Sequence, residues 1–521
     1  MNFERASGII LHPTSLPGDY GIGDLGPQAH QWVKFLARCG CSLWQVLPLG
    51  PTGYGDSPYQ CFSAFAGNPY LVSPQLLLED ELLQEEDLAD MPEFPDDRVD
   101  FGAVIPWKVK LLDRAYARFQ AAAGSELHAE FHAFQQDKAS WLEDFALFMA
   151  LKEANGGGSW VGWSPALRQR DPAALEKARR RLADAIQRQK FRQFLFFRQW
   201  DALHQVARAL GIRIIGDIPI FVAHDSADVW ANPGLFYLFQ NGKPEFVAGV
   251  PPDYFSATGQ LWGNPIYRWN VHAASGYSWW MERIRAVLEL VDIIRVDHFR
   301  GFAGYWEVKG NAKTAEKGRW VSVPGMDFFE TVKAKLGDLP IIAEDLGVIT
   351  PDVEELRDHF ALPGMKIVQF GFSFGIGPTD PFLPHNYIKN YVVYTGTHDN
   401  DTVLGWYKRA PEDQRDFYRR YLARDGSDVS WDLIRAAWMS VAVFALAPLQ
   451  DLLSLDNRAR MNYPGNPSGN WTWRMPEKAL TKALAGRLKE VNYLYARLAA
   501  GQTKIEAKLE EAEASEADLT E

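Results

Sequence analysis

The chain contains 521 residues, of which 47% are hydrophobic and 23% are charged, and its net charge is −12. This length exceeds one compact core, so we expect an elaborated large domain or two or three modules. No basic stripe is present, which argues against a nucleic-acid partner, and no apolar run approaches the roughly 20 residues that span a membrane. Cys39, Cys41 and Cys61 are too few and too clustered for a disulfide framework and indicate buried thiols in a cytoplasmic protein.

Short apolar runs rich in β-branched residues recur along the chain, and helical stretches separate several of them. The runs predict eight strands, at residues 8–11, 43–47, 212–218, 291–296, 339–343, 366–370, 391–395 and 459–462. Helices are predicted at residues 27–39, 191–210, 279–290, 351–360 and 433–445. Pro27 suits a first helical position, and Gly211 lies just past a helix end.

Strands that alternate with helices form parallel sheets, and eight of them predict an α/β fold, a (β/α)₈ TIM barrel. About 165 residues separate the second and third strands. That distance is far too long for one crossover, so we expect mainly helical subdomains to be inserted there. A second excursion, at residues 223–275, is rich in Pro, Gly, Asn and aromatic residues and is expected to form a long ordered loop over the barrel mouth.

The expected organisation follows from these two excursions. Residues 1–50 begin the barrel with strands 1 and 2, residues 51–189 hold an active-site loop and the helical insertion, and residues 190–222 supply strand 3. Residues 223–275 form the loop over the groove, residues 276–475 supply strands 4–8 with a loop insertion after strand 4, and residues 476–521 form a C-terminal helix and an acidic tail. No separate β-sandwich is expected after Arg474.

Acidic side chains follow four of the predicted strands, at the end where barrel active sites form. Strand 3 ends near Asp217, strand 4 at Asp297 and His298, strand 5 at Glu344 and Asp345, and strand 7 at His398 and Asp399. A single Asp after a strand is usually a helix cap or a turn residue. Several carboxylates in one mouth repel one another and raise pKa values at a cost in stability, which favours a functional reason for their presence.

One of these acids has a basic neighbour. Arg295 lies two residues before Asp297, so both side chains point to the same face of the strand. A guanidinium there favours an ionised Asp297, as a nucleophile requires. Glu344, with its pKa raised by burial and by the neighbouring negative charge, suits a general acid/base.

These strand ends resemble the four short motifs of the α-amylase superfamily, and the chain is most similar to the amylomaltases, or 4-α-glucanotransferases, of glycoside hydrolase family 77. The similarity is carried by SGIILHPTSLPG, YGDSPYQCFSAFAGNPYLVS, GVPPDYFSATGQLWGNPIYRW, IIRVDHFRGF, IIAEDLGVITPDV, PFLPHNY, THDNDT and RMNYPGNPSGNWTWR. The resemblance implies an enzyme that transfers a segment of an α-1,4-glucan or maltooligosaccharide to the 4-hydroxyl of an acceptor glucan or glucose, by a retaining double displacement.

The resemblance also implies a role for each candidate residue. It makes Asp297 the nucleophile, Glu344 the general acid/base and Asp399 the transition-state stabiliser. It assigns Asp217, Arg295, His298 and His398 to the sugar at the cleavage point. Tyr59 is expected to line the groove or a second glucan-binding site, and Trp262 to belong to the loop that covers the donor chain.

Other interpretations of the supporting residues remain open. Tyr59 lies among aromatic residues and fits a place in the core equally well. Trp262 lies between Gly259 and Gly263, which indicates an exposed loop tip in contact with sugar. His298 is alternatively a structural histidine.

Two alternatives for the whole protein also remain: an α-glucan hydrolase with the same three carboxylates, and a catalytically silent glucan-binding scaffold. The presence of all three carboxylates with Arg295 favours an enzyme, but residue types alone do not show whether an acceptor sugar outcompetes water.

No metal is expected, because the histidines lack metal-ligand spacing. No dinucleotide cofactor is expected, because the GxGxxG at residues 21–26 is not followed by an acid after the next strand.

Overall fold

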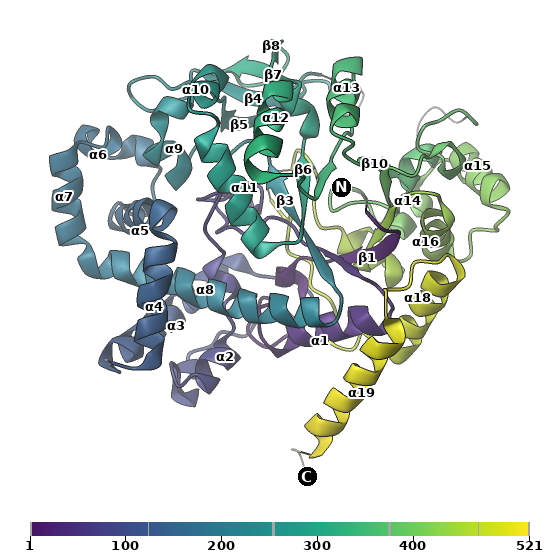
Figure 1. Ribbon diagram of the computed structural model, residues 1–521, viewed down its shortest axis with the longest axis horizontal. Helices are drawn as coiled ribbons and strands as arrows, with labels where there is room; N and C mark the ends of the chain where they lie inside the picture. The colour runs from purple at the N-terminus through teal and green to yellow at the C-terminus, as the bar shows by residue number, and fades with distance from the viewer. Residues whose placement is uncertain (1–2, 123, 253–255, 374–376, 467, 519–521) are drawn as a thin grey trace.

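The computed structural model describes residues 3–122, 124–252, 256–373, 377–466 and 468–518. Its central eight-stranded sheet is parallel, and helices lie around these strands (Figure 1). In spatial order the strands are β10 (Gly364–Ile367), β11 (Tyr391–Tyr394), β12 (Phe444–Pro448), β1 (Ala6–Ile10), β2 (Leu43–Gln45), β3 (Arg213–Pro219), β6 (Ile293–Asp297) and β9 (Ile341–Ala343). The amide of Ala343 donates to the carbonyl of Pro363 at 2.9 Å and links β9 to β10. The predicted (β/α)₈ barrel is confirmed.

The strands form because their short apolar runs can be buried on both sides, as parallel sheets require. Every barrel strand contributes a side chain to one interior cluster, which includes Ile10, Leu43, Ile215, Ile293, Ile342, Met365, Val392 and Phe444. The barrel helices include α1 (Pro27–Arg38), α11 (Ser278–Leu290), α12 (Gly325–Leu336), α13 (Pro351–His359) and α16 (Val429–Met439). The alternation of side chains along each strand thus divides the core between the barrel interior and the helices outside it.

The predicted eighth strand at residues 459–462 is wrong. The strand is β12 at Phe444–Pro448, and a 3₁₀ helix lies at Asn457–Ala459. The predicted helix at residues 433–445 ends earlier, because α16 is capped at Ser440. The run VAVFALAP at residues 441–448 is short, apolar and rich in Ala, and periodicity cannot distinguish such a run from a buried helical segment.

The chain between β2 and β3 forms the mainly helical insertion that its length predicts. It holds α2 (Pro74–Glu79), α3 (Phe101–Ala121), α4 (Glu126–Asp137), α5 (Ala139–Ala154), α6 (Pro165–Arg168) and α7 (Pro172–Arg181), and α8 (Ala183–Ala209) returns to the barrel. These helices lie to one side of the barrel, in blue to teal (Figure 1). Asp100 and Asp171 begin α3 and α7 by accepting hydrogen bonds from backbone amides of the first turn.

The segment at residues 223–275 is more regular than the predicted loop. It contains α9 (Ala227–Ala231), β4 (Phe246–Val250), β5 (Gln260–Pro265) and α10 (Trp269–Ala274). Together with β7 (Gly304–Lys309) and β8 (Gly318–Ser322), these strands form an antiparallel sheet in the order β5-β4-β7-β8. Residues 253–255, which belong to the predicted loop, lie outside the described residues. Treating the whole segment as a loop is wrong, because β4 and β5 form an antiparallel pair within it and β4 also pairs with β7, which follows β6.

Residues 475–518 contain two helices, α18 (Lys482–Leu494) and α19 (Gln502–Asp518), and α19 extends away from the barrel (Figure 1). Arg497, which is fully buried, donates hydrogen bonds to the carbonyls of Ala6, Trp438, Ser440, Ala442 and Val443. Its guanidinium thereby ties the C-terminal segment to β1 and to the loop before β12. Within the described ranges, no helix is both long enough and apolar enough to cross a membrane.

Candidate active site

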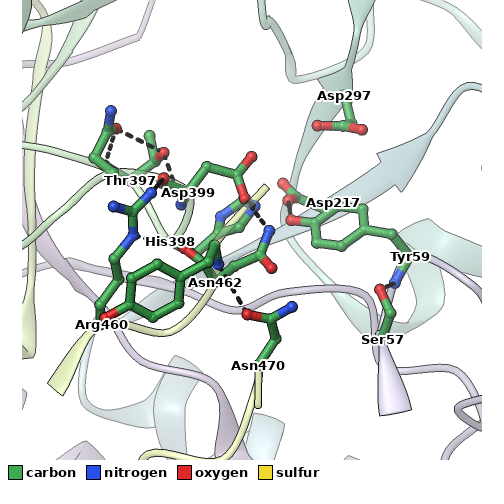
Figure 2. Close-up of polar contacts among 12 residues, drawn as sticks. Ser57, Tyr59, Asp217, Asp297, Thr397, His398, Asp399, Arg460, Asn462 and Asn470 are labelled. Carbon is green, nitrogen blue, oxygen red and sulfur yellow. Dashed lines mark hydrogen bonds and ion pairs between the residues drawn. The ribbon is translucent and has the colours of Figure 1, made fainter. Parts of the chain in front are cut away.

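Barrel strands bring polar side chains together at their carboxyl ends. Asp217 lies on β3, Arg295 and Asp297 on β6, Glu344 directly after β9, and His398 and Asp399 after β11. Figure 2 shows Asp217, Asp297 and Asp399 gathered in one region with Tyr59. The register pairs Val296 on β6 with Ala343 on β9. The next residues along these strands, Asp297 and Glu344, therefore lie side by side.

The guanidinium of Arg295 joins two of the carboxylates. Its Nη1 donates to Oδ2 of Asp217 at 2.7 Å and to Oδ1 of Asp297 at 3.2 Å. Asp217 lies directly opposite Arg295 in the β3–β6 ladder, and Asp297 shares its strand face. Because Arg295 is only 3% exposed, water screens these ion pairs weakly, and the positive charge acts strongly on both acids.

Asp297 and Glu344 have different surroundings. Burial raises the pKa of Asp297 to about 6, and Arg295 opposes that rise. Burial also raises the pKa of Glu344 well above its usual range, and the charge of Asp297 raises it further. Since the two acids interact, they titrate as a pair, and Asp297 loses its proton first. These shifts favour a negative charge on Asp297 and a proton on Glu344 over the reverse arrangement.

Backbone amides fix the carboxyl group of Glu344. Its Oε2 accepts a hydrogen bond from the amide of His298 at 2.6 Å, and its Oε1 accepts one from the amide of Leu346 at 3.1 Å. His298 has a left-handed backbone (φ 54°, ψ 51°), a conformation that histidine tolerates better than most residues. This turn directs the His298 amide from the end of β6 toward Glu344.

Tyr59 belongs to this site and does not serve the core alone. Its hydroxyl donates to Oδ2 of Asp217 at 2.7 Å (Figure 2), and its ring stacks on His398 with centroids 5.1 Å apart. The His398 ring also contacts Trp471 at 5.8 Å, and its Nε2 lies 3.4 Å from Oδ1 of Asp399. The two aromatic neighbours hold the plane of the His398 ring.

Asp399 is oriented by side chains that were not among the candidates from the sequence. Asn462 Nδ2 donates to Oδ1 of Asp399 at 2.6 Å, and Arg460 Nη2 donates to its backbone carbonyl at 2.6 Å (Figure 2). Both donors lie in RMNYPGNPSGN after β12, a motif whose Pro467 lies outside the described residues. Arg460 and Asn462 lie more than 60 residues from Asp399 in the sequence, so no local pattern predicts their contact with it. The motif itself was the only sequence feature that pointed to them.

Trp262 lies on β5 and not on an exposed loop tip, so that part of the prediction is wrong. Its indole ring is partly buried and stands edge-on to His298, with centroids 4.8 Å apart and planes at 87°. Its Nε1 donates to the side-chain carbonyl of Gln260 at 3.2 Å. Burial lowers the pKa of His298 to about 3, so this ring is neutral. The antiparallel sheet thereby places an aromatic side chain beside the end of β6.

Asp345, the second acid after β9, turns away from the other carboxylates. It forms an ion pair with Arg357 on α13, and its Oδ1 accepts a hydrogen bond from the amide of Met365 at 2.6 Å. Successive residues of an extended chain point to opposite sides, so Asp345 and Glu344 cannot share a face. Asp345 therefore connects β9 to β10 and α13.

The site offers acid–base and nucleophilic chemistry. Among the side chains that the structure describes, no group of three His, Cys, Asp or Glu could hold a metal ion. An ionised carboxylate beside a protonated one on the neighbouring strand is the pair that a retaining glycosidase uses.

Comparison with known proteins decides the family. A family model described as 4-alpha-glucanotransferase matches residues 11–481. The chain belongs to this family. The 4-alpha-glucanotransferase of Thermus thermophilus is 52% identical over 497 residues, which cover 94% of this chain and 98% of that protein. A chloroplastic/amyloplastic 4-alpha-glucanotransferase of Solanum tuberosum is 44% identical over 95% of this chain and 87% of its own length.

A solved structure of the same family supports the fold. An amylomaltase from Streptococcus agalactiae, in complex with acarbose, matches with a TM-score of 0.92 at 39% identity, over 95% of this chain and 100% of that chain. The chain is therefore an enzyme, a transferase that moves segments of α-1,4-glucan by a retaining mechanism. Neither plain hydrolysis nor a silent scaffold is favoured.

Proposed function

We propose that Asp297 and Glu344 carry out the two displacements of this transfer. Asp297 attacks the anomeric carbon while Glu344 donates its proton to the departing 4-oxygen, and a glycosyl ester forms on Asp297. Glu344, now a carboxylate, then takes the proton from the 4-hydroxyl of an acceptor. That oxygen attacks the ester, the new α-1,4 bond forms, and Asp297 is released as a carboxylate.

The observation that carries this assignment is the contrast between the two acids. Asp297 accepts a hydrogen bond from Arg295, whereas Glu344 forms no ion pair with any side chain in the described part of the chain. The two acids follow paired positions on neighbouring strands, and such strands lie about 4.8 Å apart. That spacing suits a retaining pair of carboxyls, at about 5–5.5 Å, better than an inverting pair, at about 6.5–9.5 Å.

The remaining side chains surround the sugar at the cleavage point. Asp399, held by Asn462, binds sugar hydroxyls as the ring distorts and so stabilises the transition state. Asp217, Arg295, His298 and His398 bind the same sugar, Tyr59 lines the groove, and Trp262 covers the donor chain. The S. agalactiae amylomaltase was solved with acarbose, a maltooligosaccharide analogue, which supports α-1,4-glucans and maltooligosaccharides as the substrates.

We place the enzyme in the cytoplasm on the state of its cysteines. Cys39 and Cys41 are buried, Cys61 is half-buried, and all are free thiols. Burial raises the pKa of Cys41 to about 11 and that of Cys61 to about 12, which leaves both thiols unreactive. Free thiols are typical of proteins in reducing compartments.

Incubation with maltotriose tests the reaction. We expect glucose and a ladder of longer maltooligosaccharides, with no added nucleotide, phosphate or metal, separated by chromatography. Reducing ends should stay nearly constant, because each transfer breaks one glycosidic bond and forms another. A steady rise in reducing ends, with no product longer than maltotriose, would show that water is the acceptor and contradict the proposal.

Asn462→Ala tests whether the hydrogen bond from Asn462 to Asp399 contributes to catalysis. Loss of a hydrogen bond to a charged acceptor costs roughly 1.5–3 kcal/mol, so the rate of glucose release from maltotriose should fall about 10- to 150-fold. Asn462→Asp is the matched comparison, because it keeps the shape but places a second carboxylate against Asp399 and should lose at least as much. Activity within twofold of the native enzyme in both variants would show that Asp399 needs no such support.

A further inference from the structure

His398 has one ring nitrogen that its protein neighbours leave unsatisfied. Its Nε2 lies 3.4 Å from Oδ1 of Asp399, whereas its Nδ1 is buried and has no hydrogen-bond partner among the described residues. Because Tyr59 and Trp471 contact the ring, it cannot swing toward a new partner without losing both contacts. Buried polar atoms are nearly always hydrogen-bonded, to protein or to ordered water.

A second histidine with an unpartnered ring nitrogen, His12, borders the same cavity as His398. A cavity of about 30 Å³ borders both His398 and His12, which lies just after β1. The Nδ1 of His12 is also buried and also lacks a partner among the residues that the structure describes. Both histidines are only 6% exposed, so bulk solvent does not satisfy either nitrogen.

The other polar side chains around this cavity have partners except at one atom, Oδ1 of Asp401, which is buried and has no hydrogen-bond partner among the described residues. Gln450 donates to the carbonyl of Ala459, Arg460 to the carbonyls of Asp399 and Asn462, and Asp401 forms an ion pair with Arg409. The residues around the cavity therefore carry two ring nitrogens and one carboxylate oxygen that lack partners within the described part of the chain. A buried water needs two to four polar partners and a cavity of at least roughly 10–15 Å³.

We propose that one buried water fills this cavity and bridges Nδ1 of His12 to Nδ1 of His398, which makes His12 a positioning residue of the active site. The inference rests on the proposed role of His398 at the cleavage point. His12 lies in SGIILHPTSLPG, a motif to which no role was given from the sequence. It touches the reaction only through the water and His398.

The water and the Asp399 carboxylate together favour one tautomer of His398. A neutral imidazole has one donor and one acceptor nitrogen, and the bond made by one nitrogen sets the state of the other. When the water donates an O–H to Nδ1 of His398, the proton lies on Nε2 and faces Asp399 and the sugar. The opposite tautomer would turn a lone pair toward the Asp399 carboxylate and repel it. Burial lowers the pKa of His12 to about 3, so His12 adds no charge.

Two variants of His12 distinguish a role in hydrogen bonding to the water from a role in packing alone. His12→Phe fills the cavity edge but cannot bond the water, and we expect kcat/KM for maltotriose to fall about tenfold, the scale of one lost hydrogen bond. His12→Gln offers an amide to the water and should retain activity within about threefold. The control is His272→Phe on α10, the same change at a buried histidine that does not line this cavity, which should leave kcat/KM within about twofold.

Nitrogen-15 spectra of the histidine rings report the tautomer directly. The native enzyme and His12→Gln should show the His398 proton on Nε2, and His12→Phe should show a larger share of the opposite tautomer, because only Asp399 then favours the proton on Nε2. A His398→Gln variant assigns the signal. A crystal structure of the native enzyme should place a water within hydrogen-bond distance of both Nδ1 atoms.

The outcomes distinguish this inference from the proposed function. Full activity in His398→Gln would overturn the role of His398 itself. A large loss in His398→Gln, together with native kinetics and an unchanged His398 tautomer in His12→Phe, would overturn only the water bridge. A dry cavity in the crystal, or a direct bond between the two rings, would also overturn it, and this test stands even where His12→Phe does not fold.

Discussion

Asp297→Ala is expected to lower the rate of maltotriose disproportionation by roughly 10⁴-fold or more, the scale seen when a catalytic nucleophile is removed. The variant lacks the oxygen that attacks the anomeric carbon, and no other carboxylate can take its place. Asp217 is tied to Arg295 and Tyr59, and Asp399 is held by Asn462. The Asp297 side chain is 28% exposed, so its truncation should leave the fold intact. Glucose release from maltotriose measures the effect.

Asp352→Ala is the control for this change. Asp352 is an exposed carboxylate in the first turn of α13, and its removal takes away one negative charge without touching the site. Activity within about twofold of the native enzyme is expected for it. A folded Asp297→Ala protein with activity within about tenfold of native would contradict the assignment of the nucleophile.

Glu344→Gln is expected to lose roughly 10²- to 10⁴-fold in rate on maltotriose, the usual contribution of a general acid. It should still form the glycosyl-enzyme from α-maltosyl fluoride, because fluoride departs without protonation. Single-turnover release of fluoride measures the first step alone. Equal losses on both donors would show that Glu344 does not act by protonating the leaving group.

The pH dependence of that first step separates the two acids. The step needs Asp297 ionised, so its rate should fall as the pH drops through about 6. With maltotriose it also needs Glu344 protonated, so the rate should fall again as the pH rises through the elevated pKa of Glu344. The resulting bell-shaped profile reports the pKa values of the pair. In Glu344→Gln with α-maltosyl fluoride, the loss at high pH should vanish while the loss at low pH remains.

The local pattern of apolar residues was sufficient to predict most of the barrel strands. Seven of the predicted strands overlap β1, β2, β3, β6, β9, β10 and β11, because each is a short apolar run bounded by polar residues. The Ala-rich β12 could not be distinguished from the helix before it. The sheet of β5, β4, β7 and β8 was missed; its β4–β7 pair joins segments on either side of β6, whereas β4 pairs locally with β5 and β7 with β8.

The acidic residues of the site were predictable because they follow the predicted strands. Asp217, Asp297, Glu344 and Asp399 each lie at or just after a strand, and the barrel topology brings those ends together. Asp345 also follows a strand but does not join the site. Its side chain points away from the other carboxylates because the side chain of the preceding residue, Glu344, points toward them. Asn462 and Trp471 reach the site from an irregular segment, whose path depends on tertiary contacts that no sequence period encodes.

Identification of the residue that becomes glycosylated tests the central claim most directly. A fluorinated maltosyl fluoride that slows the second displacement should accumulate the glycosyl-enzyme, and peptide mass spectrometry then locates the ester. We expect the sugar on the peptide that contains Asp297, attached to that carboxylate, in the native enzyme and in Glu344→Gln. An ester on Asp399 or Glu344 would contradict the mechanism. So would turnover of this donor with inversion at the anomeric carbon and no covalent adduct.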